Sequence, residues 1–208
     1  MPKAFLEEEK KEIRNKLLSK GKELFERLGF KKTSVEDIAR KCGIAKGSFY
    51  LFYKTKEELF ADIVENLEDE IRGEIIRDIF SKPGLPKEIL RKLLQYQFKV
   101  IEEKPLIKLL LDEGEIETIM LRLPEEKRKK LIKSDDDFIS SMVGKWQQEG
   151  VFRKESPEVL SGFFRALFFL NLHKEGIGEE VYPEVIELFI DMVCESMIQG
   201  KDKNNDRS

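Results

Sequence analysis

TSVEDIARKCGIAKGSFYLFYKTK, residues 33–56, is the stretch of sequence that decides the fold of this chain. It opens with a helix signal, because Thr33 followed three residues later by Glu36 fits the capping box that satisfies the first backbone amides of a helix. The helix that follows has an apolar face made of Val35, Ile38 and Ala39. An amphipathic helix of this kind packs that face against a neighbour.

A second short helix follows a glycine in the same stretch. Gly43 can take the positive φ that ends a helix, and Ile44 resumes the apolar pattern. The second helix, predicted over Lys46–Phe52, is too short to be stable alone and must be held by a neighbour. This spacing is typical of a helix-turn-helix, which offers its second helix to the DNA major groove, and equally of a plain helical hairpin.

The flanking residues favour the helix-turn-helix, because the sequence resembles the TetR family of transcriptional regulators over about its first 60 residues. In the first helix the resemblance rests on Leu17, Gly21, Leu24, Phe25, Gly29 and Phe30, with Gly21 where alanine is usual. Across the two short helices it rests on Thr33, Ser34, Val35, Asp37, Ile38, Ala39, Gly43, Ile44, Lys46, Gly47, Ser48, Phe49 and Tyr50. Beyond them it rests on Lys54, Lys56, Glu57, Glu58, Leu59 and Phe60.

The rest of the chain is helical in pattern, without the alternation typical of strands and without a repeat of fixed period. Helices are predicted over residues 56–80, 87–103, 106–113, 124–148, 157–174 and 182–199. The chain is therefore predicted to be all-α, with about nine helices. The resemblance implies a three-helix DNA-binding domain at 9–56 and a helical ligand-binding and dimerisation domain at 57–200. The polar composition of residues 201–208 predicts a disordered tail.

The net charges of the two predicted domains support this division, whereas the net charge of the whole chain does not. A net charge of −3 argues by itself against a nucleic-acid binder. Residues 1–56, however, carry a net +7, which leaves −10 for the other 152 residues. The basic segment coincides with the helix-turn-helix and favours contact with phosphates, although exposed lysines such as Lys22, Lys31 and Lys32 would also occur on an ordinary solvated surface.

The resemblance also implies which residues touch DNA. The predicted phosphate contacts are Thr33, Ser34, Tyr50, Lys54 and Lys56. The predicted base-reading residues are Ala45, Lys46, Gly47 and Ser48. Lys46 alone among these four has a long polar reach, suited to guanine acceptors in the major groove.

Three positions depart from the family pattern. Ala45 stands where a serine often caps the second helix, and it forgoes a cap worth about 1 kcal/mol. Leu51 and Phe52 replace a tyrosine or histidine pair, and neither can form a hydrogen bond with phosphate. Inward packing is the alternative role for both.

The last two predicted helices carry more apolar residues than one packed face holds. The resemblance implies that two copies of the chain pair through these helices into a four-helix bundle, and complete burial within one core is the alternative. The predicted dimer interface comprises Phe163, Leu167, Leu170, Ile186, Phe189, Ile190, Val193 and Met197.

A family member would bind an inducer in the helical body. The candidate pocket residues are Tyr96, Phe98, Met120, Met142, Trp146, Phe164 and Phe168, with His173 as a polar anchor. Ordinary core packing is the alternative for each aromatic and methionine. The ligand would act through the helix at 56–80 on the spacing of two recognition helices, which must lie about 34 Å apart to enter successive major grooves.

The expected function is that of a sequence-specific DNA-binding regulator, a repressor released from a palindromic operator by a small-molecule inducer. The alternative is a helix-turn-helix dimer without an inducer, acting through architecture or a protein partner. A single histidine, no nucleophile beside a base and no glycine-rich phosphate loop give no support to an enzyme, and no cofactor is expected.

Cysteine use and hydropathy set two further expectations. Cys42 and Cys194 lie far apart without clustered histidines, so neither a disulfide nor a metal site is expected. No apolar run approaches the roughly 20 residues of a membrane span, and a cytoplasmic location is expected.

Overall fold

The computed structural model describes residues 7–111 and 113–198, and the predicted tail at 201–208 lies outside them. Within these ranges the side chains of residues 113, 131–140, 157, 161, 165, 168, 171 and 172 are not described. The chain divides into two compact units. Unit 1 comprises Met1–Glu70 and Lys104–Ile132, and unit 2 comprises Ile71–Glu103 and Lys133–Ser208.

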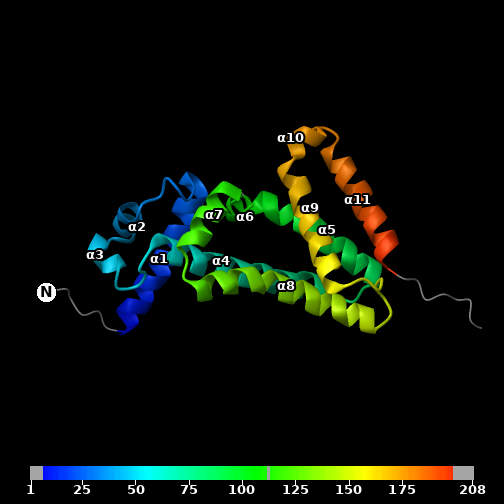
Figure 1. Cartoon of the computed structure of the whole chain (residues 1–208), viewed down its shortest axis with the longest axis horizontal. Helices are drawn as coiled ribbons and strands as arrows, with labels where there is room; N and C mark the ends of the chain where they lie inside the picture. The colour runs from blue at the N-terminus through cyan, green and yellow to red at the C-terminus, as the bar shows by residue number, and fades with distance from the viewer. Residues whose placement is uncertain (1–6, 112, 199–208) are drawn as a thin grey trace, which may run out of the picture. The chain divides into compact units, whose positions relative to one another are not determined.

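Unit 1 begins with the three helices of the predicted DNA-binding domain (Figure 1). They are α1 (Glu7–Leu28), α2 (Val35–Cys42) and α3 (Lys46–Phe49), and the first part of α4 (Lys56–Ile75) follows. Three buried aromatic rings join α1 to α4. The ring centroids of Phe25, Phe30 and Phe60 lie 5.2–5.4 Å apart, and each residue is at most 1% exposed. Aromatic pairs at this separation add to the free energy gained by burial.

The glycine that departs from the family pattern lies where α1 approaches α4. A Cβ built on Gly21 would lie 3.0 Å from Ile63 and 3.1 Å from Leu59. The side chains of Leu59 and Ile63 are both buried. Glycine here therefore allows a close approach of the two helices that a larger residue would obstruct.

Unit 1 also contains helices from the middle of the chain, namely α6 (Pro105–Leu110), α7 (Glu113–Arg122) and the start of α8 (Glu125–Gln148). Glu115 of α7 accepts a hydrogen bond from the backbone amide of Phe30 at 3.2 Å. Arg122 of α7 forms an ion pair at 3.3 Å with Glu57, which is only 4% exposed. The predicted domain at 9–56 thus lies inside a larger unit that these helices complete.

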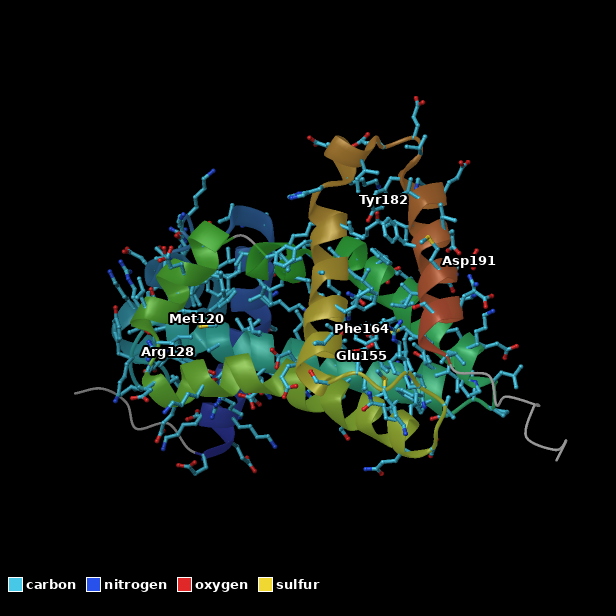
Figure 2. All side chains as sticks on the ribbon, turned by 45° about the vertical axis from the view of Figure 1, so that its right-hand side comes forward. Met120, Arg128, Glu155, Phe164, Tyr182 and Asp191 are labelled. Carbon is cyan, nitrogen blue, oxygen red and sulfur yellow. The ribbon has the colours of Figure 1, made fainter. Side chains whose placement is uncertain are left out.

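Unit 2 is built around the second half of the chain. It includes the π-helical end of the α4 segment (η1, Ile76–Phe80), α5 (Pro86–Glu103), α9 (Pro157–Leu172), α10 (Lys174–Ile177) and α11 (Tyr182–Met197). The helix α5 contacts both α9 and α11 (Figure 1). Figure 2 labels Phe164 on α9 and Tyr182 on α11, and both side chains belong to the hydrophobic core of this unit.

The prediction of an all-α fold is confirmed, with two helices more than the sequence indicated. The described residues form eleven α-helices and the π-helical segment. The two that were missed are α7, which starts with the poor helix sequence Glu113–Gly114, and α10, which is a single turn of four residues. Within the described ranges, none of the helices has the length and apolar content that spanning a bilayer would demand.

Candidate nucleic-acid interface

The turn between α2 and α3 has the geometry that its glycine predicts. Gly43 has φ +71°, in the left-handed region, and its amide donates to the carbonyl of Arg40 at 3.1 Å. The helix α3 ends at Phe49, three residues before the predicted end at Phe52. A tighter turn follows, because the amides of Leu51 and Phe52 donate to carbonyls three residues earlier, at 3.2 and 2.9 Å.

One buried ring holds α3 in place. Phe49 is fully buried, while Ala45, Lys46 and Gly47 are exposed and Ser48 is half-buried. Ala45 provides no side-chain cap, as expected. A Cβ on Gly47 would meet open space, so no packing demand within the chain explains a glycine there. The start of α3 is therefore an accessible surface on a fixed base.

The cap of α2 is one residue later than predicted. Ser34, not Thr33, accepts the hydrogen bond from the amide of Asp37, at 3.1 Å. Thr33 is 1% exposed, and its hydroxyl donates to the carbonyls of Gly29 (2.8 Å) and Leu24 (3.3 Å). Its side chain closes the turn after α1, whereas Ser34 is exposed.

Lys56, a predicted phosphate contact, also has partners inside the protein. Its ammonium group donates to the carbonyl oxygens of Phe30 (2.8 Å) and Thr33 (2.9 Å) and lies 4.2 Å from the centre of the Phe30 ring. Burial lowers the pKa of this ammonium. Lys56 fastens the first turn of α4 to the loop between α1 and α2.

Other cations remain available to a polyanion. Lys54 is exposed, as are Lys31 and Lys32, and among the described residues none forms a salt bridge with these three. Lys46 is 56% exposed in its side chain and lies 3.4 Å from a carboxylate oxygen of Glu36. An exposed pair at this distance contributes little, so Lys46 can exchange Glu36 for a base or phosphate acceptor.

The turn after α3 presents two large side chains to solvent. Tyr50 is 51% exposed and Leu51 is 60% exposed, whereas Phe52 is half-buried. The inward alternative therefore does not hold for Leu51. Tyr53, two residues on, is 3% exposed, and burial raises its pKa to about 12.

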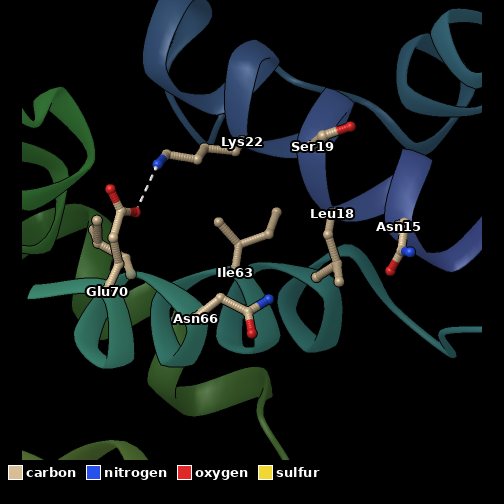
Figure 3. Close-up of a pocket in the computed structure, with 8 residues that line it drawn as sticks. Asn15, Leu18, Ser19, Lys22, Ile63, Asn66 and Glu70 are labelled. Atoms are coloured by element: carbon tan, nitrogen blue, oxygen red, sulfur yellow. Dashed lines mark ion pairs between the residues drawn. The ribbon is translucent and has the colours of Figure 1, made fainter. Parts of the chain in front are cut away.

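Two hollows in unit 1 were not predicted. The first, of about 250 Å³, lies between α1 and α4, with the apolar side chains of Leu18, Ile63 and Leu67 (Figure 3). At its edge Lys22 and Glu70 form an ion pair at 3.7 Å. The second, of about 610 Å³, adjoins it through Leu18 and is lined mostly by charged groups of α1, α4 and α8.

Asp62 is the centre of the charged hollow. It accepts from Arg14 of α1 at 2.9 Å and forms an ion pair with Lys127 of α8. Burial raises the pKa of Asp62, but the hydrogen bonds and charges of Lys127 and Arg14 outweigh that effect and lower the pKa overall. The three residues lie too far apart in sequence for any local pattern to connect them.

The predicted inducer-pocket residues are distributed between core and surface. In unit 2, Phe98, Trp146 and Phe164 are each at most 8% exposed within the hydrophobic core, and Met142 packs against that core. Half-buried Tyr96 donates to Glu74. Met120 belongs to unit 1, His173 is an exposed residue that ends α9, and the side chain of Phe168 is not described.

The predicted dimer residues divide in the same way. Five of them lie in the core of unit 2, each at most 9% exposed, and so offer no surface to a second copy: Leu167, Ile186, Ile190, Val193 and Met197. Phe163 and Leu170 pack against that core in part, and Phe189 is 39% exposed. The exposed apolar surface of α11 lies instead at Leu188 (60%) and Met192 (59%), beside Phe189.

Comparison with known proteins gives consistent matches. Residues 17–63 match the family described as bacterial regulatory proteins, tetR family. The chain is 38% identical over 107 residues to the uncharacterized HTH-type transcriptional regulator YerO of Bacillus subtilis. This alignment covers 50% of this chain and only 36% of YerO. It is 26% identical over 176 residues to YhgD of the same organism, also named an uncharacterized HTH-type transcriptional regulator, covering 80% of this chain and 88% of YhgD.

A solved structure shares the fold over most of the chain. A protein from Saccharomonospora viridis, described as a transcriptional regulator and solved in complex with choline, aligns with a TM-score of 0.69. The alignment covers 91% of this chain and all of that one, at 14% sequence identity. At this identity the likeness concerns the fold.

Replacing Lys56 by methionine is expected to lower the free energy of unfolding by about 1–3 kcal/mol, because two part-buried carbonyl groups lose a charged donor while the apolar stem is kept. The measurement is urea unfolding followed by circular dichroism. Lys54→Met is the matched control and should change stability by less than about 0.5 kcal/mol. Equal stability of the two variants would contradict the assignment of Lys56 to an internal role.

Proposed function

We propose that this chain is a sequence-specific DNA-binding transcriptional regulator of the TetR family, whose model matches residues 17–63. The observation that carries the proposal is the start of α3, where Lys46 and Gly47 are exposed above a fully buried Phe49. A helix held from beneath and open on its outer face has the form needed to enter a major groove. The net charge of +7 on residues 1–56 supplies the attraction to DNA.

The contacts with DNA divide into two kinds. Lys46 is the residue suited to base edges, and Gly47 leaves room for the groove wall. Ser34, Tyr50 and Lys54 are exposed and suited to phosphates. Thr33 and Lys56 act indirectly, by fixing the loop from which α2 begins.

A homodimer would present two copies of α3 to a palindromic operator. Support comes from α11, where Leu188, Phe189 and Met192 form an exposed apolar strip at helical spacing. An apolar strip of this kind is typical of a surface covered by a partner, and two-fold pairing is the commonest form of assembly. On this proposal the interface uses the outer face of α11, while its inner face forms the core.

Repression relieved by a small molecule bound in unit 2 is the mode of regulation that we propose. The related fold that was solved with choline supports the general capacity to hold a ligand. The helix α4 offers a route for the effect, because it starts immediately behind α3 and is held at its beginning by Lys56 and Glu57. A ligand that binds one arrangement of α4 more tightly than another could change operator affinity by at most the ratio of those two affinities.

A second candidate is a DNA-binding dimer that acts without a small-molecule inducer. The observation in its favour is the packing of Phe98, Trp146 and Phe164, which are core residues of unit 2. Side chains that fill a core leave no space among themselves for a ligand. A protein partner would then supply the regulation.

Removing the polar groups of the recognition surface should weaken operator binding without unfolding the chain. Lys46→Ala and Tyr50→Ala are each expected to lower affinity about tenfold, because each removes a contact with a base or a phosphate. Fluorescence anisotropy with a duplex selected in vitro measures this. Lys92→Ala, an exposed charge-matched change in unit 2, is the control and should bind as the parent does. Unchanged binding of both test variants would reject α3 as the recognition helix.

Charge on α11 should prevent dimerisation. The double change Leu188→Glu and Met192→Glu is expected to convert a dimer to a monomer in sedimentation velocity, since it places charges in an apolar interface. Leu85→Glu, which alters a leucine that is 67% exposed outside α11, should leave the dimer intact. A parent chain that sediments as a monomer would overturn the interface.

Native mass spectrometry separates the two modes of regulation. If the chain takes an inducer, the freshly purified dimer should carry an additional small-molecule mass, and removal of that molecule should raise operator affinity. A bare dimer whose operator affinity no compound in a metabolite collection alters would favour the second candidate.

A further inference from the structure

Leu51 is a large apolar side chain with no evident role in the fold. It is 60% exposed, although it lies in the turn that directly continues α3. A single exposed leucine is common and needs no explanation on its own. Its position beside the recognition surface is what gives it significance.

The backbone around Leu51 is firmly held. Its amide donates to the carbonyl of Ser48 at 3.2 Å, and the amide of Tyr53 donates to the carbonyl of Phe49 at 3.1 Å. Phe49 and Tyr53, on either side of Leu51, are 0% and 3% exposed. With these two rings inside, Tyr50 and Leu51 project outward from a rigid turn.

Three residues near Leu51 in the sequence carry polar groups that reach solvent. An i to i+3 hydrogen bond places Leu51 one tight turn from Ser48, and Tyr50 is 51% exposed beside it. Lys54, three residues on, is also exposed. An exposed apolar group beside such polar groups is buried favourably against DNA only where DNA meets it with an apolar group.

The DNA major groove contains one such group, the C5-methyl of thymine. We propose that Leu51 is a specificity-determining residue that packs on a thymine methyl in each half-site of the operator. This inference rests on the proposed function, because it assumes that α3 enters the major groove. On this proposal Leu51, which cannot form side-chain hydrogen bonds, recognises an A·T pair through the thymine methyl group.

The test removes the methyl group and nothing else. After in vitro selection with the full-length chain, each thymine of the selected duplex is replaced in turn by deoxyuridine, and affinity is measured by anisotropy. At one thymine per half-site the parent chain should lose affinity about fourfold, the value expected for one buried methyl group. Leu51→Ala should show no loss at that position, and Leu51→Met should retain it.

The controls separate failure of this inference from failure of the proposed function. Leu85→Ala, a change of an equally exposed leucine elsewhere, should leave the deoxyuridine effect intact. Equal melting temperatures of the Leu51 variants and the parent show that folding is unaffected. If the parent selects a duplex but no thymine position depends on Leu51, the inference is wrong and the proposed function stands. If no duplex is selected, the proposed function itself fails.

Discussion

The constraint on which the rest of the structure depends is the shortness of α3. A helix of four residues has too few internal hydrogen bonds to persist alone, so its position must come from side chains beneath it. Full burial of Phe49 supplies that anchor, and the left-handed Gly43 sets the direction in which the chain enters the helix. With Phe49 inside, Ala45, Lys46 and Gly47 are left at the surface.

The same requirement explains why the loop before α2 is held so firmly. Thr33 and Lys56 both bind carbonyl groups of the segment that joins α1 to α2. Phe30 lies in the aromatic cluster directly below, and its amide is bound by Glu115 of α7. A helix with little stability of its own thus depends on contacts from α1, α4 and α7.

The charged groups of unit 1 connect α4 to three other helices. Glu57 pairs with Arg122 of α7, and Asp62 pairs with Arg14 of α1 and Lys127 of α8. Glu57 and Asp62 are one to two helical turns apart, at the end of α4 nearest the recognition segment in sequence. The carboxylates of Glu57 and Asp62 are mostly buried, so a shift of α4 here would have to replace the partners that stabilise them.

Much of the architecture could be predicted from the sequence, because helical spacing and the Gly43 turn are local signals. The errors have a common physical origin, since local patterns do not reveal long-range partners. Thr33 and Lys56 are residue types that often contact phosphates. In the folded chain they donate instead to backbone carbonyl groups that are distant in the sequence. On α11 the pattern predicts two apolar faces without showing which one the core takes. Ile190, predicted at the dimer interface, lies in the core, and the exposed Leu188 is not among the predicted residues.

The central claim, that two copies of α3 enter the major groove, is tested most directly by dimethyl sulfate footprinting on a selected duplex. The reagent methylates guanine N7 in the major groove and adenine N3 in the minor groove. The account predicts protection of guanine N7 in two clusters about one helical turn apart, with adenine N3 still reactive. Protection of adenine N3 alone, or of neither atom at saturating protein, would contradict it.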